Sequence, residues 1–577
     1  MAKSPRVYLL ILSVWIAVLI PAVPAMAHVV SAAIRTHWYL GALTIASALF
    51  VTYFWLNGTK DIVYTLYFHL VQRPRQQDEV PRRAATEAAP KVVLVYCTCD
   101  DFSGESLLRS MAQKYDNYEV VILDDSNKPE SRAEVDEFAA RYGVPVVRRP
   151  DRAGFKAGNL NNYLRTADYD YFVILDSDEI IPSGYIERSL DYFAHYGNAG
   201  IVQANHSATR NRNNFMRTFA IGVDSHWIAY QSVKDRHGFL SLLGHGAMVS
   251  RECYLAAGGF PSVVAEDLCF SIAARDAGYY TVFAPDIRCE EEFPISYFAF
   301  KKRHSKWTQG NMEFIKRYTA TILNSRMTWF EKLDIFLFTY SLPLTALFSL
   351  YVIIHVIALP ALGYTVTYPM WMLIPTVAFL IAPLLNDIIF HFDRMPKRKL
   401  AGYLLNSIVL YGSMFFVSLR SSITSAFGKS IFVVTPKTTD RLTVREALTS
   451  TRGEIGFGIV LAAISWLLTH SVLPVLLIVA PALLCAFLAR KHNEDSPAAV
   501  AEMPAAVVPP ARSAAEERHQ LAALATEEEA DPWEERIPEP RFVERLGVRL
   551  PALRLAALEA SAPAKLGRAL RHLGASA

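Results

Sequence analysis

The sequence predicts an α/β domain with a mixed, mainly parallel sheet, inserted between two groups of membrane-spanning helices. Apolar segments long enough to cross a bilayer stand on both sides of one long, more polar stretch. Within that stretch, short apolar runs alternate with amphipathic ones, which is the pattern of a sheet covered by helices on both faces. Acidic residues follow two of the apolar runs, at the strand ends where such sheets bind their ligands.

Composition indicates a membrane protein rather than a nucleic-acid-binding protein. The chain has 577 residues, enough for several domains, and hydrophobic residues make up 52% of them. The formal net charge is only +3, so no nucleic-acid footprint is visible. The six cysteines are scattered, and Cys97 and Cys99 have no second pair that would complete a zinc site. Nothing suggests a disulfide framework, which fits a cytosolic location for the soluble part.

Six apolar segments are expected to cross the membrane. They span residues 7–27, 38–56, 335–359, 371–390, 455–470 and 471–488, the last two forming a tight hairpin. Lys and Arg side chains gather in four places, within residues 3–6, 73–83, 394–399 and 490–491. Six crossings put all four places on one side, together with both termini, and the positive-inside rule makes that side cytoplasmic. We therefore expect a multi-pass protein of the inner or plasma membrane with its soluble domain in the cytoplasm.

Two segments leave alternatives open. Residues 400–426 are apolar but carry several serines and an arginine, and a seventh crossing there would move the basic pair at 490–491 to the outside. We therefore expect an interfacial helix that lies in the membrane plane. At the N-terminus, Arg6, the apolar run and the small residues at 25–27 fit either an uncleaved helix or a cleavable signal peptide. Cleavage would still leave residues 38–56 to lead the soluble domain inward.

The soluble stretch runs from residue 91 to about residue 318. Its buried-strand runs are rich in Val, Ile and aromatic residues, and they span 91–97, 118–123, 144–147 and 171–175. Helical patterns lie between them, for example at 106–114 and 131–142. Asp124 and Asp125 follow the second run, and Asp176 and Asp178 follow the fourth. Because ligands of such sheets sit at the carboxyl ends of the strands, these acids are candidate site residues.

The acids and bases of this stretch have both functional and structural interpretations. Asp176 and Asp178, spaced by one residue, can hold Mg²⁺ or Mn²⁺ that also binds phosphate oxygens, although such a pair also occurs by chance and caps helices. Glu266 and Asp267 open an amphipathic stretch, so they either complement the helix dipole or supply a general base. A basic stretch follows with Arg303, Lys306 and Trp307; its cations could neutralise a diphosphate and its indole could stack on a sugar, or it is a basic helix at a membrane surface.

At these residues the chain resembles the membrane-embedded, processive family 2 glycosyltransferases, which include cellulose, chitin and hyaluronan synthases. That family carries D, D-x-D, E-D and Q-x-x-R-W motifs in this order, matched here by Asp124-Asp125, Asp176-Ser177-Asp178, Glu266-Asp267 and residues 303–307. Residues 156–161 look like the family's K-A-G-N-x-N, in which the lysine, here Lys156, contacts the donor diphosphate. Thr98 and Asp101 stand where the family has a T-Y-N-E motif beside the nucleobase. The similarity runs from about residue 91 to residue 488.

Further motifs refine the resemblance. Residues 432–437 are similar to the F-x-V-T-x-K gating loop of bacterial cellulose synthase, which implies that Phe432, Val434, Thr435 and Lys437 cover the active site when the donor binds. The last catalytic motif reads R-x-x-K-W rather than Q-x-x-R-W, so a lysine without arginine's planar fork replaces the arginine. Residues 291–294, residues 307–311 and the Gly-His-Gly around His245 look closer to osmoregulated periplasmic glucan synthases, which favours glucose as the sugar. No PilZ-type domain is recognisable, so control by cyclic-di-GMP is not implied.

The resemblance implies a glycosyltransferase A-type fold and a specific set of roles. Asp267, with Glu266, would act on the acceptor hydroxyl; Asp176 and Asp178 would hold Mg²⁺ or Mn²⁺. The donor-binding residues would be Thr98, Asp101, Asp124, Asp125, Lys156, Asp176, Arg303 and Lys306, and the acceptor-binding residues Trp307 and His245. The implied reaction is the inverting, processive polymerisation of a β-glucan-type polysaccharide from UDP-glucose, with the product passed through the membrane.

Two other functions remain open at this point. One is a non-processive membrane transferase that adds a sugar to a lipid, and the other is a transporter or scaffold that only binds nucleotide. The expected partners are a nucleotide-sugar donor, a growing polysaccharide and the bilayer, with an accessory protein on the outer side as an option and no nucleic acid.

The predicted organisation has seven parts along the chain. They are two membrane helices in 1–60, a linker in 61–90, the transferase domain in 91–325, two helices in 326–392, the interfacial helix and gating loop in 393–453, two helices in 454–490 and a largely disordered tail in 491–577.

Overall fold

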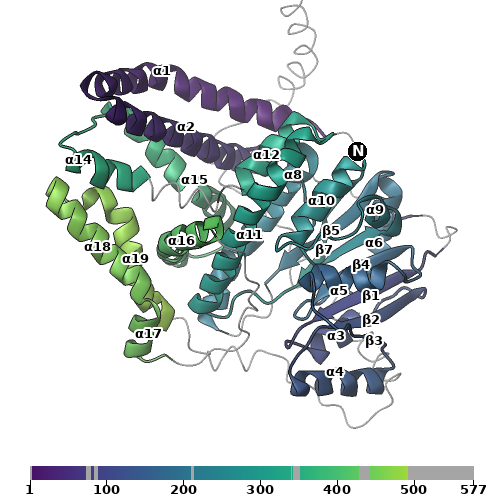
Figure 1. The fold of residues 1–577 in the computed structure, drawn as a ribbon. Helices are drawn as coiled ribbons and strands as arrows, with labels where there is room; N and C mark the ends of the chain where they lie inside the picture. Colours follow the sequence, from purple (N-terminus) through teal and green to yellow (C-terminus); the bar gives the residue numbers. More distant parts are fainter. Residues whose placement is uncertain are drawn as a thin grey trace, which may run out of the picture.

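One mixed seven-stranded sheet forms the centre of the soluble domain, to one side of a group of long apolar helices (Figure 1). The computed structural model describes residues 3–72, 80–83, 89–208, 213–339, 341, 351–427 and 442–491. The strands are β1 (Val92–Thr98), β2 (Tyr118–Asp124), β3 (Val146–Val147), β4 (Tyr171–Asp176), β5 (Ala199–Ser207), β6 (Ala247–Ser250) and β7 (Tyr280–Glu290). Their order in the sheet is β3-β2-β1-β4-β6-β5-β7.

The first half of the sheet is parallel and the second half is not. Strand β1 pairs in parallel with β2 and β4, and β2 pairs in parallel with β3. Strand β6 then runs antiparallel to both of its neighbours, β4 and β5, and β5 pairs in parallel with β7. The four runs predicted from the sequence coincide with β1 to β4 within about two residues. This is the mixed sheet of a glycosyltransferase A-type fold, with the carboxyl ends of β1, β2 and β4 at one edge.

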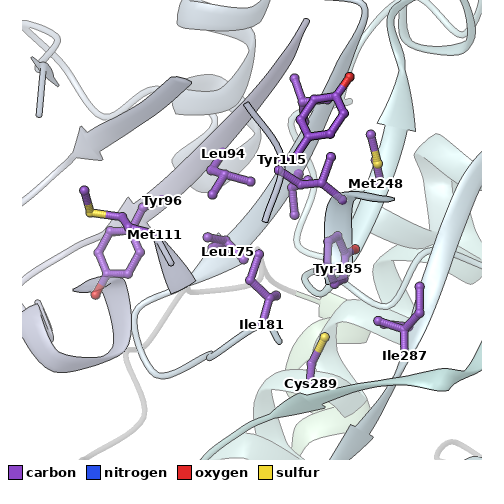
Figure 2. Close-up of a cluster of buried hydrophobic side chains, with 14 of the residues drawn as sticks. Leu94, Tyr96, Met111, Tyr115, Leu175, Ile181, Tyr185, Met248, Ile287 and Cys289 are labelled. Atoms are coloured by element: carbon purple, nitrogen blue, oxygen red, sulfur yellow. The ribbon is translucent and has the colours of Figure 1, made fainter. Parts of the chain in front are cut away.

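Helices cover both faces because successive strand residues point in opposite directions. Val92, Leu94 and Tyr96 of β1 belong to one buried cluster, shown in Figure 2, whereas Val93 and Val95 belong to another. The first cluster is completed by α3 (Gly104–Ser110), α4 (Pro129–Tyr142) and α6 (Tyr185–His195). The second is completed by α5 (Phe155–Leu164), α9 (Arg251–Ala256) and α10 (Glu266–Asp276).

Within the described residues, six helices are long and apolar enough to cross a membrane. They include α1 (Arg6–Thr36), α2 (Trp38–Tyr67, continued by the π-helical turn Phe68–Gln72), α15 (Leu373–His391), α16 (Lys397–Phe427), α18 (Arg452–Thr469) and α19 (Leu476–Lys491). Helices α1 and α2 lie side by side, as do α18 and α19 (Figure 1). Trp55 of α2 joins α15, because its indole Nε1 donates to Thr376 Oγ1 at 3.1 Å.

For two of the predicted membrane segments, the crossing or the placement in the membrane stays a prediction. Part of the segment at 335–359 lies outside the described residues, so its crossing stays a prediction; the described parts are α12 (Trp329–Thr339), the turn Ile354–Ala358 and α14 (Leu359–Ala361). Residues 400–426 belong to α16, one continuous helix of 31 residues. Its length and composition would allow it to span a bilayer, and its placement in the membrane plane stays a prediction.

The remaining helices are α7 (Asn214–His226), α8 (Ser232–His237), α11 (Tyr297–Asn324) and α17 (Val444–Ser450), with short π or 3-10 turns at Trp227–Gln231, Met370–Met372 and Leu473–Val475. Three of them, α7, α8 and α11, lie between the sheet and the apolar helices, and α17 packs on α19. Helix α11 packs along α16 through polar contacts: His304 Nε2 lies 2.7 Å from Ser418 Oγ, and Ser305 Oγ lies 2.8 Å from Ser421 Oγ. Because α11 follows β7, this contact fixes the soluble domain against the apolar helices (Figure 1).

Candidate functional site

The carboxylate of Asp101 connects the loop after β1 to the loop after β4 through hydrogen bonds. Asp101 accepts hydrogen bonds from Thr98 Oγ1 at 3.1 Å and from the Cys99 backbone N–H at 2.8 Å. Its other oxygen accepts from Ser177 Oγ at 2.8 Å. Thr98 itself ends β1 and is buried. The two residues expected beside the nucleobase therefore lie together, at the carboxyl end of β1.

Both acids that follow β2 are bound by arginines that follow β3. The Arg148 Nε donates to Asp124 Oδ2 at 2.6 Å. Arg149 donates two hydrogen bonds to Asp125, from Nε to Oδ1 at 2.9 Å and from Nη2 to Oδ2 at 2.6 Å. Both side chains of this second pair are almost fully buried, at 6% and 7% exposure. Two guanidinium groups therefore lie at the same edge of the sheet as Asp124 and Asp125, the acids that were predicted to bind the donor.

Lys156 joins the first helical turn of α5 to two other parts of the site. Its Nζ lies 2.5 Å from Asp176 Oδ1 and 2.8 Å from the Gly244 carbonyl oxygen. Burial would lower the pKa of Lys156, but the Asp176 carboxylate outweighs it and raises that pKa. The lysine is therefore a firmly charged cation beside the first acid of the D-x-D pair.

Residues 176–179 alternate between partly exposed and buried positions, so their side chains point alternately toward the open site and toward the interior. Asp176 and Asp178 are partly exposed, whereas Ser177 and Glu179 are buried. The two outward carboxylates supply only oxygen atoms, which are the ligands that Mg²⁺ and Mn²⁺ prefer. The residues present therefore fit the divalent cation that the resemblance implies, with Lys156 as a competing cation on Asp176.

The second acidic pair stands at the amino end of α10. Asp267 Oδ1 accepts from the Leu268 backbone N–H at 2.8 Å, and its Oδ2 lies 3.5 Å from the point where a Cβ atom on Gly244 would be. Burial and the neighbouring Asp267 carboxylate raise the pKa of Glu266 to about 7. Burial also raises the pKa of Asp267. A carboxylate with a raised pKa is a better proton acceptor near neutral pH than an exposed one.

Helix α11 presents the basic and aromatic residues of the last motif to these acids. Burial lowers the pKa of Lys306, while the carboxylates of Glu266 and Asp176 act against it, which places this lysine between the two acidic stations. Arg303 lies one turn earlier, with its Cζ 4.4 Å above the ring centre of Trp307. The indole is 44% exposed. An exposed aromatic face on the same helix as Lys306 is suited to stacking on a sugar ring.

His245 belongs to a buried cluster behind the D-x-D loop rather than to an open surface. Its Nδ1 lies 3.2 Å from Glu179 Oε2, and its Nε2 lies 3.7 Å from Glu291 Oε2. Burial would lower the pKa of His245, but these two carboxylates raise it to about 10. Glu291 also receives a hydrogen bond from His206 Nδ1 at 2.7 Å and lies 3.6 Å from Arg303 Nη2. The contact of His245 with an acceptor stays a prediction.

The structure brings five of the predicted residues together from distant parts of the chain. Asp176, Lys156, Glu266, Asp267 and Lys306 interact with one another or with Gly244. The predicted gating-loop residues Phe432, Val434, Thr435 and Lys437 lie outside the described residues. The roles of all these side chains remain proposals that the geometry permits.

Sequence reasoning missed four residues that shape this region. Arg148 and Arg149 were not predicted, although they directly follow the Val146–Val147 strand and so lie at the same sheet edge as the acids they bind. Their signal was positional, because the carboxyl ends of neighbouring parallel strands meet. Glu179 and His206 had no such signal, since they meet His245 only through the antiparallel insertion of β6 between β4 and β5.

Comparison with known proteins links this arrangement to a family. Residues 171–384 match the family model described as glycosyl transferase family group 2. Two curated relatives from Arabidopsis thaliana, named probable glucomannan 4-beta-mannosyltransferases 10 and 11, are 27% and 26% identical to the chain over 228 residues. These matches cover 37% of this chain and 41% and 51% of the relatives, so the chain spans about half of their length. A solved mannosyltransferase from Pyrobaculum calidifontis, in complex with GDP-Man and Mn²⁺, is 18% identical with a TM-score of 0.39, covering 66% of this chain and 99% of its own.

Proposed function

We propose that this chain, which carries a family 2 glycosyltransferase domain, transfers a hexose from a nucleotide-diphosphate donor to a sugar hydroxyl with inversion at the anomeric carbon. The observation that carries the proposal is the convergence around Lys156 and Gly244. A cation, the first D-x-D acid and the second acidic pair approach one another there, although they come from three separate segments. Bases, phosphate-binding cations and an aromatic platform within one site are the groups that such a transfer requires.

The donor diphosphate would lie against the positive side chains. Lys156 and Lys306 provide two cations near Asp176, and a divalent cation held by Asp176 and Asp178 would add charge to stabilise the leaving diphosphate. Thr98 and Asp101 would border the nucleobase at the end of β1. Because Lys156 already binds Asp176, its ammonium is positioned to move only slightly when phosphate oxygens arrive.

Asp267 would remove the proton from the acceptor hydroxyl. The hydroxyl oxygen then forms a bond to the anomeric carbon while the bond from that carbon to the phosphate oxygen breaks, and the nucleoside diphosphate leaves. One such displacement converts an α-linked donor into a β-linked product. Glu266 stands beside this base, and its carboxylate, with that of Asp176, draws Lys306 toward the site. Trp307 would support the acceptor sugar.

The sugar is the point at which the comparisons change the sequence-based expectation. Motifs near His245 and residues 291–294 favoured UDP-glucose, whereas both curated relatives carry mannosyltransferase names. We therefore put a mannosyl donor first, with GDP-mannose as the first compound to test and UDP-glucose as the second. The proposed product is a β-linked mannan or glucomannan-type polysaccharide.

A small hollow between α7 and α16 bears on the proposal of a growing chain as the acceptor. Its enclosed volume is about 30 Å³, and its lining is mainly aromatic, with Phe215, Phe219, Tyr403 and Tyr411 beside the amide of Asn406. The Tyr411 ring packs against Phe300 of α11, with ring centres 5.6 Å apart. Phe300 and Trp307 are seven residues apart and so share one face of that helix. Its enclosed space suits a water molecule rather than a sugar, so a path for sugar units toward the apolar helices would require these side chains to move apart.

A test of the function needs the whole chain and a donor panel. The protein, purified in detergent and returned to bilayers, is incubated with radiolabelled GDP-mannose, UDP-glucose or UDP-N-acetylglucosamine and Mn²⁺. Label in high-molecular-weight, β-mannanase-sensitive material supports the proposal. Label that extracts with lipid would instead favour single transfer to a lipid acceptor, and nucleotide binding without transfer would overturn the enzyme assignment. Protease accessibility of residues 91–325 in sealed vesicles checks the proposed cytoplasmic side.

A further inference from the structure

A second cluster of metal-ligating side chains lies behind the D-x-D loop. Glu179 follows Asp178, His206 lies near the end of β5, and His245 precedes β6. The side chains of Glu179 and His206 are buried, at 1% and 0% exposure, and that of His245 is partly buried, at 14%. One ligand atom from each residue lies within 4.8 Å of the other two, so the three already surround a common point.

The orientation of each side chain leaves one ligand atom for that point. Glu179 Oε2 accepts from the Gly246 backbone N–H at 3.0 Å, which turns its Oε1 toward His206. His206 Nδ1 bonds to Glu291 Oε2 at 2.7 Å, which leaves its Nε2 facing Glu179 Oε1 at 4.0 Å. A metal-ligating histidine typically has such a carboxylate on its other nitrogen, because the carboxylate fixes the tautomer and orients the ring.

Two of these buried atoms make no well-formed hydrogen bond within the described part of the chain. They are Glu179 Oε1 and His245 Nδ1, the second of which is ion-paired with Glu179 Oε2 at 3.2 Å. Leaving a charged or polar atom buried and unsatisfied costs free energy, so an occupant that satisfies both is favoured. The two N–O distances within the cluster are 3.2 Å from His245 Nδ1 to Glu179 Oε2 and 4.0 Å from His206 Nε2 to Glu179 Oε1, against the roughly 3.3 Å that separates N and O ligands around a tetrahedral zinc ion, so His206 would move slightly inward on binding.

Gln203 is a competing partner for His206 that does not fill the site. Its Nε2 lies 3.2 Å from His206 Nε2, but it also lies 3.1 to 3.3 Å from the carbonyl oxygens of Ala204, His245 and Gly246. The amide can therefore donate to carbonyls alone and leave the lone pair of His206 Nε2 for a cation. Gln203 Oε1 accepts from the Leu243 backbone N–H at 2.9 Å, so the amide is held in this orientation.

The charges of the cluster also leave room for a cation. Glu179 and Glu291 bring two buried carboxylates, and Arg303 approaches only Glu291, at 3.6 Å. A bound divalent cation would balance the negative charge that remains, because buried charges in proteins are paired or coordinate metals.

We propose that Glu179, His206 and His245 form a zinc site that is separate from the Asp176–Asp178 site. Two imidazoles and one carboxylate suit Zn²⁺ better than Mg²⁺, and three protein ligands leave a fourth position for water. The ion would tie the D-x-D loop, the end of β5 and the loop before β6 together. Through Glu291 it would also hold Arg303, and with it the stacking of Arg303 on Trp307.

The test measures metal rather than turnover, so it does not depend on the donor or on the proposed function. The full chain is purified with a tag that contains no histidines, dialysed against buffered zinc and analysed by plasma mass spectrometry. We expect about one zinc per chain in the wild type and almost none in His206→Ala and His245→Ala. His195→Ala, an exposed histidine of α6, and Asp178→Asn are the matched controls and should keep the zinc.

A spectroscopic measurement covers the case in which a variant fails to fold. Replacement of zinc by Co²⁺ in the wild type should give the intense visible absorption of a four-coordinate site with nitrogen and oxygen ligands. A wild type that binds no zinc and gives only a weak six-coordinate Co²⁺ spectrum would overturn the site, and the cluster would then be an ion-pair network around a protonated His245. Loss of zinc in Asp178→Asn, or its retention in His206→Ala, would equally overturn it.

Discussion

Lys156 Nζ lies 2.5 Å from Asp176 Oδ1, so the first helical turn of α5 is joined to the end of β4 by an ion pair. The same ammonium donates to the Gly244 carbonyl oxygen, next to which Asp267 lies. One side chain thus connects the acid proposed to hold a cation with the loop beside the proposed base. Its two possible partners, carboxylate and diphosphate, compete for the same charge.

Replacing Lys156 by Met should change two affinities in opposite directions. Loss of a charged hydrogen bond to phosphate should weaken nucleoside-diphosphate binding about ten- to a hundredfold. Mn²⁺ binding in the absence of nucleotide should strengthen, because a competing cation leaves Asp176. Titration calorimetry measures both, with the exposed Lys114→Met as the control. A variant that loses both affinities would contradict the competition.

Replacing Asp267 by Asn should remove the proposed base while keeping its size. Turnover should fall by about 10²- to 10⁴-fold, which is typical for loss of a general base. Donor affinity should stay within a few-fold, since Lys156 and Lys306 remain. The exposed Glu137→Gln on α4 is a matched carboxylate control for initial rates. Wild-type turnover in Asp267→Asn would show that another group takes the proton.

Glu266 makes stability depend on pH. Burial and Asp267 raise its pKa to about 7 from an ordinary value of 4.5, so the folded state binds a proton more readily than the unfolded state. Between these two values the free energy of unfolding therefore falls as pH rises. The Glu266→Gln variant should not lose stability in this way. Its melting temperature minus that of the wild type should therefore increase as pH rises from about 4.5 to about 7. Parallel melting curves across this range would contradict the raised pKa.

Trp307 should matter for the acceptor rather than for the donor. Trp307→Ala removes an exposed aromatic face and should raise the acceptor KM or shorten the product, whereas Trp307→Phe should retain much of both. Trp329→Ala removes another exposed indole, at 47% exposure, and serves as the control. Product sizing by gel filtration with labelled donor measures the effect. Equal defects in Trp307→Ala and Trp329→Ala would point to a general loss of stability.

The buried Arg149–Asp125 pair should contribute to stability as a unit. Removing one partner leaves an unpaired buried charge, which typically costs about 3–5 kcal/mol. Arg149→Met and Asp125→Asn should each lower the melting temperature, and the double variant should be less destabilised than the sum of the two. Additive losses would mean that the two hydrogen bonds of this pair are not coupled.

Much of the sheet could be predicted because each of the strands β1 to β4 contains a short run of apolar residues that is visible in the local sequence. The apolar run predicted at 171–175 became β4, and the one at 118–123 became β2, since a fully buried strand needs an unbroken series of apolar side chains. The antiparallel strand β6 is only four residues long, too short for a periodic signal, and its neighbours are set by contacts across the sheet. The D-x-D acids were found by their place after a strand.

The sequence by itself determined the alternation of strands and helices, the apolar helices on either side, and the motifs that mark a glycosyltransferase domain. These features depend on residues close together in the chain. Only the tertiary structure decided that Arg149 binds Asp125, that Lys156 binds Asp176, and that Glu179, His206 and His245 surround one point. Those contacts join residues from separate segments, and strand order and burial, rather than local preference, determine which polar atoms meet in a low-dielectric interior.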